Sequence, residues 1–325
     1  MTVTFEKGRK NKTGAGLFGI LFVCFLLAVI IYSEKSREAM LEAMIMCAKI
    51  LIPSVFPFAV IGNLIGSGAA EFPRFLTEPV AKIFGVSIEG AKALLPGLVA
   101  GFPVGASAAV RLYERGKIDK YDFEKICAFS CTPGAAFVIS GVGEGMFNDK
   151  KTGVIIYLSV IISVFAVGCF YRIFRKSKVE NTVKISLENG ENIKFTEIIS
   201  SSVKGSGNAM IVMSAFVLFF SQLTFFATEL TAYLNAPVIV DSVFKALLEV
   251  SQACRGASIM SKTSGSLVAV FATAWSGLSF QMQTLALCGK YADGGTARKL
   301  ALLRLCIALL SLIIYTALCR VSEIT

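Results

Sequence analysis

The sequence predicts an all-α, multi-pass membrane protein with an inverted-topology repeat of broken or re-entrant helices. Three observations predict this fold class: long stretches without charge, glycine and proline residues inside those stretches, and a resemblance between the two halves. Hydrophobic residues make up 55% of the 325 residues and charged residues 17%, whereas soluble domains carry about 25% charged residues. The uncharged stretches are 13–33, 50–70, 93–110, 126–143, 152–171, 205–228 and 263–289.

These stretches define the elements in chain order, since a helix that crosses the hydrocarbon layer needs about 20 apolar residues. Residues 1–37 hold a basic N-terminus and a first span. We expect this span to stay uncleaved, because its apolar run is longer than the roughly 7–15 residues of a signal peptide. Residues 38–174 then form a first membrane repeat, 175–195 a basic, polar, cytoplasmic linker, and 196–325 a second membrane repeat.

Each repeat contains complete spans and interrupted segments. In the first repeat, an amphipathic stretch leads into a span marked by Pro53 and Pro57, and a span at 152–171 closes the repeat. In the second repeat, spans at 205–228 and 300–319 flank broken apolar segments. The uncharged stretch 263–289 would rise about 40 Å as one helix, too far for a perpendicular span. We therefore expect a re-entrant turn near 275–277.

The two repeats share three matches in the same order. Residues 47–64 align with 206–223, which places Asn63 opposite Gln222. The tripeptide GAS occurs at 105–107 and again at 256–258, and PGAAF at 133–137 lies opposite SGLSF at 276–280. Ordered self-similarity of this kind indicates an internal repeat.

The distribution of charge predicts how the repeats are oriented. The net charge is +10, but the basic residues gather at the ends of spans rather than among exposed aromatic residues, which argues against a nucleic-acid partner. Because positively charged loops stay cytoplasmic, the N-terminus and the linker should be cytoplasmic. Arg304 belongs to the basic residues that precede the last span. Two similar units in opposite orientations are typical of secondary transporters.

The interruptions predict a binding site inside the membrane. Lipid cannot hydrogen-bond free backbone groups, so a non-helical segment at membrane depth must lie inside protein or beside a water-filled cavity. Helix N-termini at such points favour anionic or carbonyl-bearing ligands. Close helix packing is the alternative explanation for the small residues. The predicted substrate-binding residues are Gly101, Pro103, Gly105, Ser107, Thr132, Pro133, Gly134, Gly256, Ser276, Gly277, Ser279, Gln281 and Gln283.

Two charged residues complete the predicted site. Glu249 lies in an apolar segment, where an acidic side chain is costly and marks a site for a coupling ion, either a proton or sodium. Arg255 is expected to compensate the charge of an anionic solute. A salt bridge between Glu249 and Arg255 is the alternative.

Catalytic and metal sites are not expected. The chain has no histidine, which excludes a Ser-His-Asp triad, and it contains no P-loop sequence. Its nine cysteines lie almost all in apolar segments without a CxxC pair, and they are interpreted as small buried hydrophobic residues. We therefore predict no enzyme activity, no metal and no cofactor.

Several of these motifs resemble a known family. The segments "AGFPVGASAAVRLYERGKID", "CTPGAAFVISGVGEGMF", "LLEVSQACRG" and "WSGLSFQMQ" resemble the sporulation integral membrane protein YlbJ family, whose members carry nucleoside-recognition (Gate) domains. The last segment is also similar to the C-terminal hairpin of concentrative nucleoside transporters. The resemblance implies an inverted-repeat fold with a central site. It further implies a role in moving dipicolinic acid from mother cell to forespore, across the outer forespore membrane.

The leading hypothesis is a cell-membrane transporter that moves a small, polar, anionic solute by alternating access, with dipicolinic acid as the best candidate. One alternative is a nucleoside transporter that uses the amides of Gln281 and Gln283 to bind its substrate. An alternative of another class is a membrane scaffold in a sporulation or envelope complex. The expected partners are the solute, the lipid bilayer and a coupling ion, and a homo-oligomer is left open.

Overall fold

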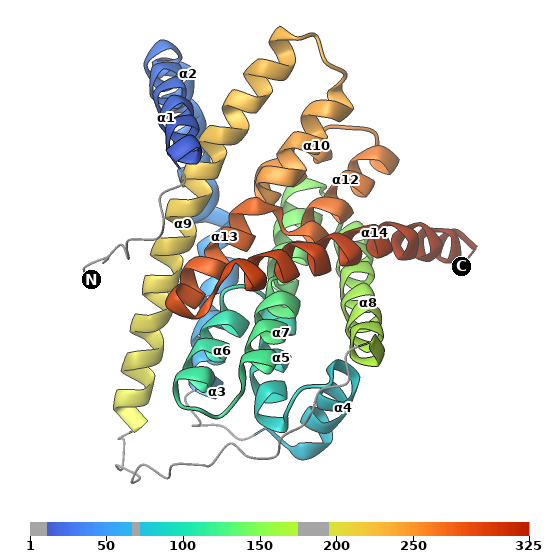
Figure 1. Cartoon of the computed structure of the whole chain (residues 1–325). Coiled ribbons are helices and arrows are strands. Elements are labelled where there is room, and N and C mark those ends of the chain that lie inside the picture. The colour runs from blue at the N-terminus through green and yellow to red at the C-terminus, as the bar shows by residue number, and fades with distance from the viewer. Residues whose placement is uncertain (1–11, 67–71, 175–194, 325) are drawn as a thin grey trace.

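The computed structural model describes residues 12–66, 72–174 and 195–324, and within these ranges every regular element is a helix (Figure 1). The basic residues before Lys12 and almost all of the predicted linker 175–195 lie outside the described residues, as do the orientation predictions that rest on them. The described part of the chain confirms the all-α fold class.

The first half begins with α1 (Lys12–Ile31), which takes up the predicted first span, and α2 (Ser33–Met46). A π-helical turn, η1 (Cys47–Leu51), joins α2 to α3 (Ile52–Gly66) without interruption. The amphipathic stretch and the following span are therefore one continuous candidate span, Ser33–Leu64, rather than two elements. The π-turn comes just before Pro53, whose missing N–H disturbs the regular hydrogen-bond ladder.

The rest of the first half alternates short helices and breaks. Between α4 and α5 the chain bends by 93°, and α8 closes the half as a candidate span. The bounds are α4 (Arg74–Phe84), α5 (Ile88–Ala100), α6 (Val104–Glu114), α7 (Lys120–Ser130), the π-helix η2 (Phe137–Met146) and α8 (Lys150–Phe174).

The second half repeats this order without an equivalent of α4. A long helix comes first, two interrupted helical segments follow, and a long helix closes the half. The bounds are α9 (Phe195–Tyr233), α10 (Val238–Leu248), α11 (Val250–Ser258), α12 (Lys262–Trp275), α13 (Gly277–Cys288), the short η3 (Gly289–Tyr291) and α14 (Gly294–Ile324).

Four described helices are long and apolar enough to cross a membrane, or five if the bent pair α4–α5 is one span. Apolar side chains such as Ile211, Ile313 and Phe170 are more than 60% exposed on these helices. In water such surfaces would be unfavourable, whereas lipid covers them at no cost. The predicted spans at 152–171, 205–228 and 300–319 are confirmed as parts of such helices.

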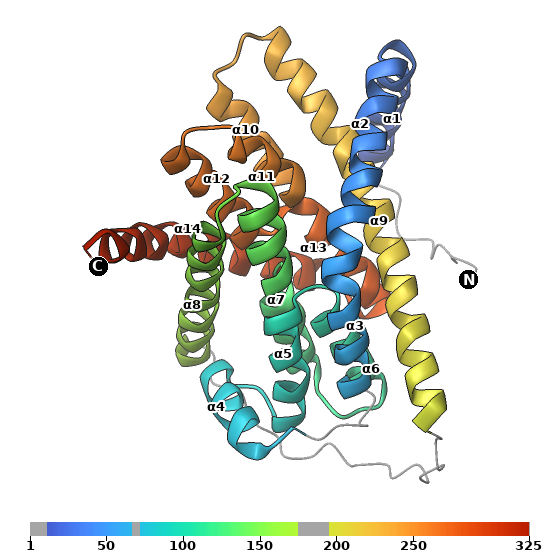
Figure 2. The same cartoon turned by 180° about the vertical axis from the view of Figure 1, so that it is seen from behind.

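The long helices that open the two halves pack side by side and run in opposite directions (Figure 2). At one end, Ser36 Oγ donates to Gln222 Oε1 over 2.6 Å, and Gln222 Nε2 donates to the Ser36 carbonyl over 2.8 Å. At the other end, Asn63 Nδ2 donates to Ser206 Oγ over 2.8 Å. An inverted repeat requires equivalent helices to be antiparallel, as α2–α3 and α9 are. The inverted repeat itself stays a prediction.

Candidate functional site

Four helix breaks, two from each half, meet near the middle of the molecule, and we call this place the central crossing. The breaks lie between α5 and α6 (101–103), between α7 and η2 (131–136), between α10 and α11 (Glu249) and between α12 and α13 (Ser276). The N–H of Phe102 donates to the Thr132 carbonyl over 2.8 Å. Ser276 Oγ donates to the Cys131 carbonyl over 2.7 Å, which links the two halves.

The third contact at the crossing is a close approach of backbones. A Cβ on Gly277 would lie 3.0 Å from the Leu248 carbonyl oxygen and 3.3 Å from Glu249 Cα, so the breaks of the second half touch each other. The rings of Phe102 and Phe280 pack edge to face across the two halves, with centroids 5.4 Å apart. All four breaks are therefore held in one contact network.

The local sequence explains why the chain breaks at these points. Gly101 has φ 75° and ψ −161°, a backbone conformation that is essentially restricted to glycine. A Cβ on Gly134 would lie 2.2 Å from the Ala100 carbonyl oxygen, so no other residue fits there. Ser276 adopts the left-handed conformation at φ 68°, which ends α12. The predicted interruptions at 101–103, 133–134 and 276–277 are confirmed.

The structure brings most of the predicted site residues together. Ser279, Gln281 and Gln283 are buried in the first two turns of α13, directly after the fourth break. Gln281 Nε2 donates to the Trp275 carbonyl over 3.1 Å, whereas Gln283 Oε1 is buried without a hydrogen-bond partner. The predicted residues at the breaks themselves are Gly101, Pro103, Thr132, Pro133, Gly134, Ser276 and Gly277.

Gly105 and Ser107 lie within α6 rather than at its break. A Cβ on Gly105 would lie 2.2 Å from Ser130 Cβ and 3.0 Å from Gly97 Cα. Gly105 therefore permits close packing of α6 against α5 and α7. Ser107 is half-buried one turn into the helix.

Two expectations for the second half are contradicted: a helix break at Gly256 and the alternative salt bridge between Glu249 and Arg255. Gly256 is an ordinary residue within α11, and the break lies seven residues earlier, at Glu249. Arg255 is half-exposed and pairs with Glu42 over 2.8 Å, so the alternative salt bridge between Glu249 and Arg255 does not form. The repeated tripeptide GAS thus marked a short sequence match and not a shared break.

Glu249 is completely buried in an extended conformation between α10 and α11. Its Oε2 accepts a hydrogen bond from the N–H of Gln252 over 2.7 Å and so caps α11. Its Oε1 and the nearby Ser251 Oγ are both buried without a hydrogen-bond partner. No ion pair found among the described residues includes Glu249. A buried carboxylate without a cationic partner is unfavourable unless a proton or another cation joins it.

The charge distribution predicted that Arg304 precedes the last span, and this prediction is wrong. Arg304 lies within α14, with 0% of its surface exposed. Its Nη2 donates to Ser276 Oγ over 2.8 Å and to the Ala274 carbonyl, at the end of α12. Its Nε and Nη1 have no partner. The available signal was its place inside the apolar run LALLRLCIALL.

Two Lys–Asp ion pairs join the halves away from the crossing, and we call them the first and second latch. In the first latch, Lys120 of α7 lies 3.8 Å from Asp293, before α14; in the second, Lys262 of α12 lies 2.8 Å from Asp149, before α8. Each half thus gives a lysine to one latch and an aspartate to the other. Both aspartates begin the same motif, Asp-x-x-Thr, at 149–152 and 293–296.

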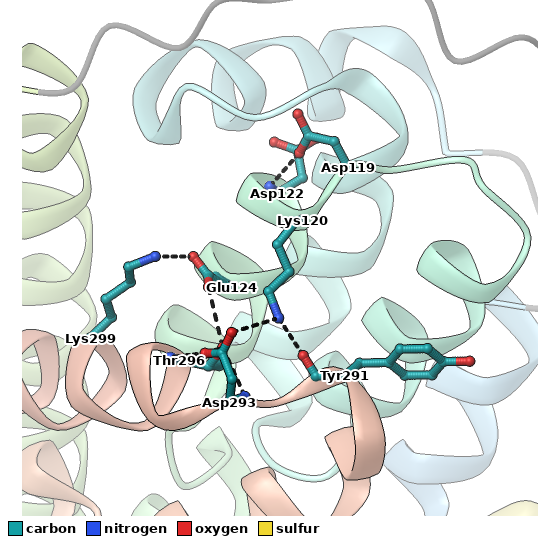
Figure 3. A network of polar contacts seen from close by, with 8 residues as sticks. All are labelled: Asp119, Lys120, Asp122, Glu124, Tyr291, Asp293, Thr296 and Lys299. Atoms are coloured by element: carbon teal, nitrogen blue, oxygen red, sulfur yellow. Dashed lines mark hydrogen bonds and ion pairs between the residues drawn. The ribbon is translucent and has the colours of Figure 1, made fainter.

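The first latch belongs to a wider polar network between the starts of α7 and α14 (Figure 3). Lys120 Nζ also donates to the Tyr291 carbonyl, and Lys299 pairs with Glu124. Thr296 Oγ1 donates to Glu124 Oε1 over 3.2 Å. Several charged contacts therefore join the two halves at this end of the molecule.

The latches lie near opposite ends of α14. Asp293 of the first latch directly precedes this helix, whereas Lys262 of the second latch interacts electrostatically with Cys319 near its other end. The helix rises about 37 Å from Gly294 to Cys319. The two latches are therefore far apart.

Both latch carboxylates are charged at neutral pH. The Lys262 ammonium and then the Thr152 hydroxyl lower the pKa of Asp149 from 3.8 to about 2. The backbone N–H and hydroxyl of Thr296 hold the pKa of Asp293 below its ordinary value. Because folding lowers the pKa of Asp149, the second latch contributes its full stability at pH values above 3.8. It loses this stability as the pH falls through about 2.

Among residues 12–66, 72–174 and 195–324, no three potential metal-ligating His, Cys, Asp or Glu side chains lie together. A groove of about 610 Å³ lies between α10, α12 and α14, lined almost entirely by apolar residues such as Val243, Leu267 and Leu312. Such a lining suits lipid acyl chains and not a polar solute.

Comparison with known proteins finds one distant relative. The chain is 24% identical to the sporulation integral membrane protein YlbJ of Bacillus subtilis (strain 168) in an alignment of 229 residues that covers 65% of this chain. The match covers 56% of the length of that relative. No family model and no solved structure matches. The chain is thus distantly related to an integral membrane protein of sporulation.

Proposed function

We propose that this chain is a membrane carrier that moves a small, polar, anionic solute by alternating access around the central crossing. The observation that carries the proposal is the meeting of four helix breaks, two from each half, within a bundle of membrane-length helices. Broken helices at membrane depth are the usual substrate sites of secondary transporters with repeated halves.

The polar groups at the crossing favour an anion. Three helices, α6, α11 and α13, begin at breaks, and a helix N-terminus carries a partial positive charge. Arg304 adds a full positive charge beside the fourth break. Glu249, which lacks a cationic partner, is the proposed site of the coupling ion.

Dipicolinic acid is the candidate solute that the family resemblance implies, and the forespore membrane is the corresponding location. The name of the distant relative supports a role in sporulation. Dipicolinate is a rigid dianion, which suits a site that combines an arginine with helix N-termini.

The latches support alternating access, because each half gives a lysine to one and an aspartate to the other, and they lie near opposite ends of α14. In a carrier, one face of the crossing opens while the other stays closed. Breaking the first latch would let the halves separate on one side of the crossing, and breaking the second would let them separate on the other side. Exposed ion pairs contribute little to stability, which permits reversible opening.

The test is uptake of labelled dipicolinate and of labelled uridine into liposomes that contain the purified chain, with protein-free liposomes as control. Saturable dipicolinate uptake is the expected result. Uptake of uridine alone would favour the nucleoside alternative, in which the unpartnered Gln283 Oε1 accepts a hydrogen bond from the base. If neither solute crosses, the carrier proposal fails and the scaffold alternative gains.

Glu249→Gln should remove the acceleration of uptake by the coupling ion. The glutamine can still cap α11, but it binds neither a proton nor a cation as a carboxylate does. Uptake is measured with an imposed proton gradient and, separately, with a sodium gradient, between about pH 5 and 8, where Asp149 stays charged. Glu42→Gln is the matched control, since Glu42 is exposed and pairs with Arg255. Equal acceleration in wild type and Glu249→Gln would exclude the coupling role.

A further inference from the structure

The burial of Arg304 needs an explanation beyond helix packing. Its guanidinium uses Nη2 to bond the Ala274 carbonyl and Ser276 Oγ, and this fixes the end of α12. Nε and Nη1 remain without partners although the side chain is 0% exposed. A buried charge with unsatisfied N–H groups is strongly unfavourable unless another group pairs with it.

No acidic side chain of the described residues supplies that pairing. None of the ion pairs found there includes Arg304, and the ionisable side chain that lies next to it is the Cys131 thiol. Within the residues that the structure describes, no acidic side chain therefore neutralises the positive charge of Arg304.

The start of α13 adds further donors at the same place. Ser276, which receives the Arg304 hydrogen bond, is also the residue before α13, a helix of 12 residues. No side chain caps this N-terminus, whereas Glu249 caps α11 and Ser261 caps α12. Free N–H groups at a helix start and an unpaired guanidinium both favour an anion.

We propose that Arg304 and the N-terminus of α13 bind a carboxylate group of the transported solute. This inference rests on the proposed carrier function and adds to it the residue and the helix N-terminus that hold the solute. A guanidinium presents N–H groups in one plane, which matches the two oxygens of a carboxylate. A bound carboxylate would accept hydrogen bonds from the unpartnered N–H groups of Arg304, and its release would leave these groups unsatisfied again.

The experiment measures equilibrium binding to the full chain in lipid nanodiscs, so that it does not depend on transport. The probes are pyridine-2,6-dicarboxylate, benzoate, citrate, the uncharged pyridine-2,6-dicarboxamide and inorganic phosphate. At least one carboxylate should bind, and the diamide should bind about tenfold more weakly than the matching dicarboxylate. Such selectivity would support the proposal without any variant. Equal binding of the diamide, preferential binding of phosphate, or no binding of any carboxylate would overturn it.

Arg304→Gln should weaken carboxylate binding at least tenfold while leaving diamide binding unchanged, and Arg304→Lys should restore part of the affinity. Arg255→Gln is the matched control, because that arginine is half-exposed, pairs with Glu42 and should keep wild-type affinity. Thermal unfolding shows whether each variant is folded. Unchanged carboxylate affinity in folded Arg304→Gln would overturn the proposal. If that variant does not fold, the wild-type comparison of dicarboxylate with diamide decides.

The two proposals fail in different ways. A carboxylate that binds through Arg304 but never enters liposomes would preserve the site and overturn the carrier function. Uptake of uridine without binding of any carboxylate would preserve a carrier and overturn the role of Arg304.

Discussion

Gly101→Ala should destabilise the chain by roughly 3 kcal/mol or more. The backbone conformation at φ 75° and ψ −161° costs about 1–3 kcal/mol for a residue with a side chain. The new Cβ would also lie 2.3 Å from the Gly134 nitrogen and 2.4 Å from the Thr132 carbonyl oxygen, and overpacking adds about 1–3 kcal/mol. The first two breaks would have to separate. The loss should appear as a lower thermal midpoint and a smaller monodisperse fraction in detergent.

Gly256→Ala is the matched control for this prediction. Gly256 lies inside α11, and its added Cβ would meet only the Lys245 side chain, with Cδ at 3.6 Å and Nζ at 3.9 Å, which are ordinary contacts. Alanine is favoured over glycine in a helix by about 1 kcal/mol, so this variant should be as stable as the wild type or more stable. Equal thermal midpoints for the two variants would show that the contact between the first two breaks does not hold the fold together.

Oxidative cross-linking of Cys127 to Cys288 should reduce uptake about tenfold or more, because it would prevent the halves from separating at the face of the first latch. The two sulfur atoms lie 3.2 Å apart, Cys127 in α7 and Cys288 at the end of α13. Oxidation can join the two sulfur atoms in a disulfide once they approach to about 2 Å. Both thiols are buried, so the oxidant must be membrane-permeant. Uptake is measured before oxidation, after it, and after reduction, which should restore activity.

Cys127→Ser is the control for the cross-link, since it removes one partner and should leave uptake insensitive to the oxidant. Cys131→Ser should remain sensitive, because its partner residues differ from the pair at 127 and 288. The cross-linked fraction is determined by mass spectrometry. Full uptake in fully cross-linked protein would mean that α7 and α13 move as one body and that the first latch is not a gate.

The helical elements and three of the four breaks could be predicted from local sequence. Uncharged stretches of sufficient length give membrane helices, because each helix satisfies its own backbone hydrogen bonds. Gly101, Pro133 and Gly277 interrupt such stretches with residues that favour turns. The break at Glu249 has no glycine or proline. It forms because a glutamate in extended conformation caps α11, which is visible only in the folded chain.

The sequence by itself determined the all-α membrane class, the order of spans and interruptions, and the resemblance between the halves. Only the tertiary structure decided that the four breaks touch one another, that Arg304 lies beside Ser276, and that Lys120 and Lys262 pair with aspartates of the opposite half. The physical reason is the range of the interactions. Hydropathy and backbone conformation act within one helix, whereas the charges and hydrogen bonds of the site join residues from different helices, whose packing no local pattern specifies.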